Sequence, residues 1–121
     1  VAVQAEQVHR HAAGLCMARN IRQRFLHDAE DRGAGGVVQA QFGFVVANIK
    51  RILDEAGATF RDLVKVNVLL TRASDVATMN VLYASAFGPA PYPARTTCVV
   101  HALPDPKMLI EIECVAQISG R

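Results

Sequence analysis

The sequence predicts an α+β fold in which two helices pack on one face of a mixed β-sheet. Two amphipathic segments with helical periodicity support this prediction, together with alternating or β-branched runs between and after them. Their order along the chain is strand, helix, strand, helix, strand, strand. A chain of 121 residues has the length of one domain, and we expect residues 1–121 to form it.

The composition is typical of a globular protein with an aliphatic core. Apolar residues make up 51% of the chain and aromatic residues only 6%, so aliphatic side chains must fill most of the interior. The 13 basic and 11 acidic residues leave a net charge of +2 and are spread along the chain. This balance argues against a nucleic-acid partner.

Neither the cysteines nor the histidines form a pattern that predicts a metal site. The three cysteines are widely spaced without a CxxC pair, and the four histidines do not complete a ligand set. Cys98 and Cys114 fall in strand-like runs, where reduced, buried cysteine is the ordinary case, which favours a cytoplasmic location. No apolar run approaches the ~20 residues of a membrane span, and no signal peptide is evident.

Residues 1–37 are the least regular part of the sequence. Val1–Val3 and Gly14–Ile21 have the composition of short strands. The charged stretch Arg22–Gly36 ends in Gly33-Ala34-Gly35-Gly36 and predicts an exposed loop. This glycine run does not predict a phosphate-binding loop of the Walker type, because no Lys-Ser or Lys-Thr pair follows it.

Residues 38–57 predict the first helix. Apolar side chains recur there at helical spacing and form one continuous stripe. The stripe consists of Phe42, Val45, Val46, Ile49, Ile52, Leu53 and Ala56. Charged residues occupy the opposite side, and Gly57 provides a C-terminal stop. A helix with such a stripe needs a sheet to pack on.

A strand and the second helix follow directly. Val64–Thr71 alternates, which predicts a strand with one apolar face made of Val64, Val66, Val68 and Leu70. The second helix begins near Ser74 or Asp75, either of which can cap it, and Gly88-Pro89 ends it. Its apolar stripe consists of Val76, Met79, Tyr83, Ala86 and Phe87.

Two more strands, Ala94–His101 and Met108–Ile118, complete the predicted sheet. The helices cover one sheet face, so the other face is left open. We expect that open face to carry Arg95, Thr97, Val99, His101, Leu109, Glu111, Glu113, Val115 and Gln117. A half-apolar sheet face that also carries charges is typical of an interface between copies of a chain.

Arg95 is a candidate anion-binding residue. It begins a strand behind Tyr92-Pro93-Ala94, and its planar guanidinium can hold a carboxylate with two parallel hydrogen bonds. The alternative interpretation is a surface arginine. Asn80, three positions before Tyr83, either reaches a site at the edge of the helix or binds local backbone.

Glu111 and Glu113 are candidate bases. Alternation places both carboxylates on one face of the last strand, where a carboxylate in a water-poor interface can orient or deprotonate a water molecule. The alternative interpretation is that they face solvent on an edge strand. Periodicity further predicts that Arg95 and Glu111 share the open sheet face.

Several segments between residues 39 and 118 resemble the RidA (YjgF-type) family. The matching segments are Gln41, Asn48–Gly57, Asp62–Thr71, Asn80–Tyr83, Phe87, Pro93–Thr97, Leu103-Pro104 and Glu111–Glu113. Their order and spacing together carry the resemblance. Residues 1–37 diverge from the family pattern, because the N-terminal Gly-Pro-Tyr-Ser motif is missing and Ala18-Arg19 replaces the usual Ser-Gly.

The resemblance implies a chorismate-mutase-like fold and a homotrimer with clefts between subunits. It also implies an enamine/imine deaminase that hydrolyses reactive 2-imino or enamine acids to 2-keto acids and ammonia, without a metal or organic cofactor. By this resemblance, Arg95 and the backbone around Thr97 hold the substrate carboxylate, and Glu111 positions the attacking water. Asn80 lines the neighbourhood, and Ala18-Arg19 belongs to one wall of the cleft.

Two other classes of function stay open. The first is a non-catalytic trimer that binds a small carboxylate or a partner protein and acts in regulation. In that case Arg95 still matters, whereas Glu111→Gln leaves affinity nearly intact. The second is RNA cleavage or translation inhibition, which the near-balanced charge disfavours and which a steep salt dependence of RNA binding would support.

Overall fold

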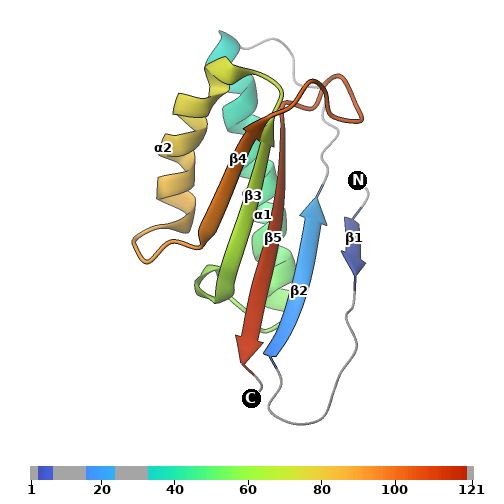
Figure 1. The fold of residues 1–121 in the computed structure, drawn as a ribbon, viewed down its shortest axis with the longest axis vertical. Helices are drawn as coiled ribbons and strands as arrows, with labels where there is room; N and C mark the ends of the chain where they lie inside the picture. Colours follow the sequence, from blue (N-terminus) through green and yellow to red (C-terminus); the bar gives the residue numbers. More distant parts are fainter. Residues whose placement is uncertain (1–2, 7–15, 24–32, 120–121) are drawn as a thin grey trace.

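A computed structural model describes residues 3–6, 16–23 and 33–119, with side chains described from residue 36 to 118 (Figure 1). The strands are β1 (Val3–Glu6), β2 (Cys16–Gln23), β3 (Leu63–Leu70), β4 (Ala94–Val99) and β5 (Ile110–Ser119). The helices are α1 (Gly33–Glu55) and α2 (Val76–Phe87). A short 3₁₀ turn lies between α1 and β3, and a second one lies between β3 and α2.

The five described strands form one mixed sheet in the order β1-β2-β5-β3-β4. The β3–β4 pair is parallel and the other three pairs are antiparallel. Parallel neighbours need a crossover connection, which α2 supplies between β3 and β4. The predicted α+β arrangement is therefore confirmed.

Both helices pack on one face of this sheet, as predicted (Figure 1). The stripe of α1 and the stripe of α2 meet the inward residues of β3 and β5 in one hydrophobic core. That core includes Phe42, Val45, Ile49, Leu53, Met79, Tyr83, Phe87, Val66, Val68, Leu70, Ile110, Ile112 and Cys114. Burying each large apolar side chain contributes roughly 1.5–3 kcal/mol, most of which the conformational entropy of the chain offsets.

Helix α1 begins earlier than the sequence predicts. Gly33–Gly36 belongs to the helix rather than to a loop, while residues 24–32 of the predicted loop lie outside the described residues. Glycine is a poor helix former, so the local sequence favours a loop. Val38 is fully buried one turn before Phe42, and this extra core contact accompanies the N-terminal extension of the helix.

The strand bounds also differ from the prediction. Strand β1 continues from the predicted Val3 to Glu6, and β2 continues past the predicted Ile21 to Gln23, while residues 1–2 and 14–15 of the two predicted strands lie outside the described residues. In β3 the register is irregular between Leu63 and Lys65, so Leu63 enters the core and Val64 is 44% exposed. Pairing between strands sets these bounds and this register. The residue pattern of a single strand does not reveal how that strand pairs.

Asp75 precedes α2 at the predicted cap position, but its carboxylate does not cap the helix. Instead it accepts hydrogen bonds from Arg72 Nε at 2.8 Å and from Arg72 Nη2 at 3.1 Å. The short turn before α2 is thus held by a buried carboxylate and an arginine. None of the described helices is both long enough and apolar enough to cross a membrane.

Gly57 ends α1 in the left-handed conformation that the sequence predicts, with φ of 69°. The amide of Ala58 donates to the carbonyl of Leu53 at 2.8 Å, and the amide of Gly57 donates to that of Asp54 at 3.0 Å. These two bonds form a Schellman motif, which satisfies the last carbonyls of the helix.

We expect Gly57→Ala and Gly43→Ala to have opposite effects on stability. A Cβ at either position meets nothing within 4 Å, so the backbone alone decides the outcome. Gly57→Ala should lower the free energy of unfolding by about 1 kcal/mol, because alanine is strained at positive φ. Gly43→Ala lies in α1 and should raise it by about 0.5–1 kcal/mol. Urea unfolding checks both, and equal effects would contradict the helix bounds.

Candidate functional site

Arg95 lies on the helix-covered side of the sheet. It pairs with Val66 in the parallel β3–β4 ladder, and Val66 is a core residue that faces the helices. Paired residues point to the same face of a sheet, so Arg95 points that way too. Its guanidinium carbon sits 4.6 Å from the ring centre of Tyr83 on α2, a cation–π contact.

The charge of Arg95 is open to a ligand. The residue is exposed, and within the described part of the chain it forms no ion pair with a carboxylate. Thr97, two positions along β4, points to the same face, and its hydroxyl is buried without a hydrogen-bond partner there. An exposed guanidinium without an acidic partner can bind a small anion through its five N–H donors.

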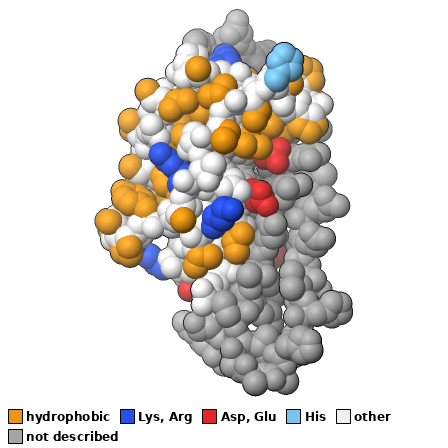
Figure 2. All heavy atoms as spheres, viewed as in Figure 1, with side chains coloured by type: hydrophobic (Ala, Val, Ile, Leu, Met, Phe, Trp, Pro, Cys, Tyr) orange, Lys and Arg blue, Asp and Glu red, His pale blue; other side chains and the backbone are white. Residues whose placement is uncertain are grey.

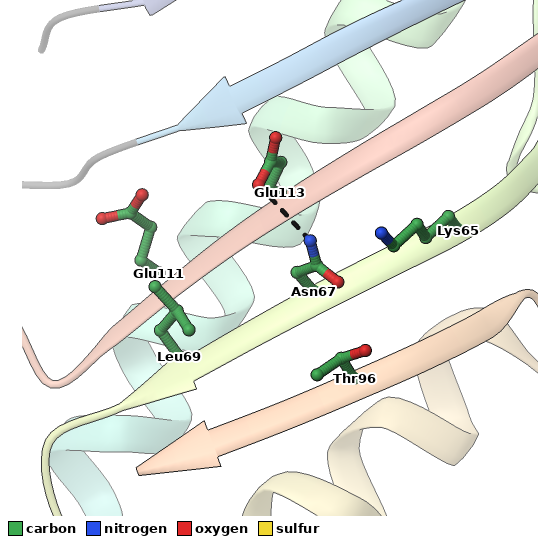
Figure 3. A pocket seen from close by; sticks show the side chains of 6 residues that line it. All are labelled: Lys65, Asn67, Leu69, Thr96, Glu111 and Glu113. Carbon is green, nitrogen blue, oxygen red and sulfur yellow. Dashed lines mark hydrogen bonds between the residues drawn. The ribbon is translucent and has the colours of Figure 1, made fainter. Parts of the chain in front are cut away.

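Glu111 lies on the opposite, open face of the sheet. A cavity of about 320 Å³ there is lined by Lys65, Asn67, Leu69, Thr96, Glu111 and Glu113 (Figure 3). Glu111 is only 7% exposed, whereas Glu113 is partly buried and its carboxylate accepts a hydrogen bond from Asn67 Nδ2 at 3.4 Å. The cavity therefore combines two carboxylates, one lysine and one amide.

Gln41 of α1 fixes the chain where it enters β5. Its side-chain amide donates to the carbonyl of Lys107 at 2.8 Å, and its oxygen accepts from the amide of Leu109 at 2.8 Å. Gln41 is buried, so both bonds are shielded from water. Glu111 follows two residues after Leu109, and this pair of bonds helps set its position.

The prediction that Arg95 and Glu111 share the open face is wrong for a single chain. Glu111 pairs with Leu69 on the open face, and Arg95 pairs with Val66 on the helix-covered face. Strands β4 and β5 are also separated by β3, about 10 Å across the sheet. Thr96, not Arg95, is the β4 residue that lines the cavity of Glu111.

The same correction applies to two other residues assigned to the open face. Thr97 and Val99 pair with Val68 and Leu70, which face the helices, so both belong to the covered side. His101 lies beyond the end of β4. The prediction failed because alternation within one strand does not show which of two neighbouring residues meets the core.

The remaining predicted residues lie apart from the cavity. Asn80 is exposed on α2, one turn before Tyr83 and on the helix side of the sheet. Ala18 and Arg19 are placed by their backbone in β2, opposite Gln117 and Ala116. Gln117 is six residues from Glu111 along β5, roughly 20 Å away. One chain therefore does not bring these residues together with Glu111.

Sequence reasoning missed three participants. Tyr83 was assigned to a helical stripe and to a segment that resembles the family, but to no site, although its ring contacts Arg95. Lys65 and Asn67 are the polar residues of an alternating strand, and nothing in that pattern separates a cavity wall from a solvated face. A basic residue two positions before an amide on the open side of β3 is the one signal available.

Cys114 is not a candidate nucleophile. Burial raises the pKa of its thiol to about 12, and the Glu113 charge acts in the same direction, so the reactive thiolate is scarce at neutral pH. Within the described ranges no three His, Cys, Asp or Glu side chains gather into a possible metal site.

Comparison with known families matches residues 26–118 to the family described as Endoribonuclease L-PSP, also called the RidA or YjgF family. The chain belongs to this family. The match covers most of the chain and begins before the segments that carry the resemblance in the sequence. The predicted membership is thus confirmed.

Two RidA-family relatives illustrate the similarity. A RutC family protein of Pyrococcus abyssi is 44% identical over 81 residues, which are 67% of this chain and 62% of that protein. Reactive Intermediate Deaminase A, chloroplastic, of Arabidopsis thaliana is 42% identical over 81 residues, 67% of this chain and 42% of that protein. The chain thus spans less than two thirds of the length of these relatives.

Solved structures of the family share the fold. RidA from Psychrobacter sp. is 32% identical with a TM-score of 0.72, and the similarity covers 95% of this chain and 86% of that one. A YjgF-family protein from Mycobacterium tuberculosis is 29% identical with a TM-score of 0.65, covering 82% and 79%. These similarities support the chorismate-mutase-like fold.

Proposed function

We propose that the protein hydrolyses reactive 2-imino or enamine acids to 2-keto acids and ammonia, at a site that two copies of the chain share. One arrangement carries the proposal above all: on one sheet face an exposed guanidinium that no acidic side chain of the described residues pairs with, and on the other face a buried carboxylate in a cavity. The relative named Reactive Intermediate Deaminase A supports the same chemistry.

The proposed reaction needs only a few protein groups. Arg95 holds the substrate carboxylate with two parallel N–H donors, and this fixes the neighbouring C=N carbon. Glu111 orients a water molecule and accepts its proton as the oxygen attacks that carbon. Glu111 returns this proton to the nitrogen, which gives a carbinolamine. The proton of the new hydroxyl then passes to the nitrogen, the C–N bond breaks, ammonia leaves, and the C=O bond of the 2-keto acid forms. Thr97 and Asn80 lie on the Arg95 side, where they can contact the substrate.

The opposite faces of Arg95 and Glu111 support a site shared between copies. We propose a homotrimer in which the open face of one chain lies against the β4 edge of the next. The open face combines the partly buried Leu69 and Val115 with the acidic residues of the cavity, whereas Leu109, which the sequence predicts on this face, packs against the core. Figure 2 shows apolar side chains spread over this view of the molecule with acidic groups beside them. Burying such a face is typical of association.

We expect the purified protein to accelerate keto-acid release from a 2-imino acid. An amino-acid oxidase generates the imine in place, and trapping the free imine with semicarbazide measures how much escapes. The protein should lower the trapped fraction in proportion to its concentration, because hydrolysis competes with trapping. Unchanged trapping with several apolar and polar 2-imino acids would contradict the proposal.

A carboxylate-binding protein without catalysis is the alternative. The Arg95 side alone suffices for it, because the guanidinium and Tyr83 lie within one chain. Pyruvate binding without any effect on imine trapping would favour this function. The family description also raises RNA cleavage. This function would be supported if the protein bound RNA and if the logarithm of the binding constant fell by several units for each tenfold increase in salt concentration.

We also propose a cytoplasmic location. The exposed Cys98 and the buried Cys114 are both free thiols, which a reducing compartment preserves. Relatives from Arabidopsis and Schizosaccharomyces pombe are named chloroplastic and mitochondrial. Fractionation of the source cells tests this proposal, and recovery in a secreted fraction would contradict it.

A further inference from the structure

We infer that Tyr83 is a positioning residue, whose ring holds the Arg95 guanidinium in place to receive the substrate carboxylate. This inference rests on the proposed function, since it names a residue that serves the same site. Tyr83 itself need not touch the substrate. It acts through Arg95, which it contacts at 4.6 Å.

An exposed arginine at a sheet edge needs such a support. Arg95 is an exposed residue of β4, the edge strand of the sheet, and a free arginine side chain carries a large rotamer entropy. Fixing it only when the ligand arrives would reduce affinity. A cation over an aromatic face is attracted by the ring quadrupole, so part of the ordering is already complete before binding.

The ring of Tyr83 is itself packed into the core. The residue is 4% exposed, and its ring stacks on Phe87 with centroids 4.5 Å apart and planes 26° apart. Phe87 in turn meets Phe60 edge to face at 5.4 Å. Tyr92, directly before β4, has its ring 6.3 Å from that of Tyr83. Arg95 therefore rests on an aromatic cluster that belongs to the core.

This support does not consume the charge of Arg95. A carboxylate partner would occupy the N–H donors that a substrate needs, whereas an aromatic ring takes none of them. Burial raises the pKa of the Tyr83 hydroxyl, and this effect outweighs the opposing influence of Arg95. The ring therefore stays neutral at physiological pH and does not compete as a phenolate.

The hydroxyl of Tyr83 is dispensable on this account. It is buried, and it has no hydrogen-bond partner in the part of the chain that the structure describes. The contact with Arg95 uses the ring face, which phenylalanine also offers. The inference therefore predicts that phenylalanine rescues what an aliphatic residue loses.

The experiment compares Tyr83→Leu, Tyr83→Phe and Phe60→Leu in the full chain. Phe60→Leu is the matched control, because it removes a ring that belongs to the same cluster but contacts Phe87, whereas Arg95 contacts Tyr83. We expect Tyr83→Leu to raise the Kd for pyruvate and the KM for the imino acid about 3- to 30-fold, with kcat within about twofold. Tyr83→Phe and Phe60→Leu should both stay within about twofold of the wild type.

A second measurement observes the contact directly. In the wild type, the ring current of Tyr83 should shift the side-chain proton resonances of Arg95 upfield in the NMR spectrum. The shift should persist in Tyr83→Phe and Phe60→Leu and vanish in Tyr83→Leu. This measurement needs neither turnover nor ligand, and circular dichroism verifies that each variant is folded.

Three results would overturn the inference. They are a wild-type affinity for pyruvate in Tyr83→Leu, a loss of pyruvate affinity in Phe60→Leu equal to that in Tyr83→Leu, and Arg95 proton resonances that are the same with and without the Tyr83 ring. Failure of the proposed function looks different. In that case the wild type neither binds pyruvate nor accelerates imine hydrolysis, and the NMR shift alone then decides whether Tyr83 positions Arg95.

Discussion

Arg95→Ala should weaken pyruvate binding about 30- to 5,000-fold and lower kcat/KM by a similar factor, since truncating one side of a charge-assisted pair costs about 2–5 kcal/mol. No acidic side chain of the described chain neutralises Arg95, so its charge is available to the ligand. Isothermal titration with pyruvate measures the first number, and the trapping assay measures the second.

Two further variants sharpen the test of Arg95. Arg95→Lys keeps the charge but loses the planar fork, and it should recover only part of the affinity. Arg51→Ala removes an exposed arginine from α1 and should change neither quantity. Equal binding by the wild type and Arg95→Ala would exclude Arg95 as the carboxylate receptor.

Glu111→Gln should lower kcat about 100- to 10,000-fold, because an amide of the same shape cannot accept the proton of the attacking water. The Kd for pyruvate should stay within about threefold, since the carboxylate of the ligand binds elsewhere. Glu111 is nearly enclosed in its cavity, and glutamine preserves its volume. Single-turnover kinetics and titration with pyruvate separate the two effects.

Glu113→Gln is the matched control for Glu111. Glu113 lies on the same face of β5 two residues away, with Asn67 donating to it (Figure 3). Its replacement should lower kcat by less than about tenfold, because the proposed mechanism gives it no proton to accept. If Glu111→Gln retained full turnover, another group would have to activate the water. If the wild type itself showed no turnover, so that no variant could alter it, the non-catalytic alternative would be favoured.

The helices and the central strands were predictable because their periodicity reflects burial on one side. The stripe from Phe42 to Leu53 and the alternation of Val66, Val68 and Leu70 both report contact with the same core. The bounds of β1 and β2 were less predictable, since pairing with a neighbour decides them. The start of α1 contradicted local propensity because the glycine-rich turn is joined to a long, well-buried helix.

The site was predictable in its chemistry but not in its geometry. Arg95 and Glu111 were named from their side-chain chemistry and from the family resemblance, yet their faces depend on register. One residue of shift between β3 and β4 would exchange the roles of Arg95 and Thr96. The contact between Tyr83 and Arg95 joins a helix to a strand twelve residues later, which no local pattern encodes.

Mixing two inactive variants tests the shared site most directly. Arg95→Ala and Glu111→Gln, co-expressed with different tags and purified as mixed oligomers, should regain activity that neither variant has alone. If each site takes Arg95 from one copy and Glu111 from the next, random assembly leaves about a quarter of the sites intact. Mixed oligomers as inactive as the separate variants would contradict a site built from opposite sheet faces of two chains.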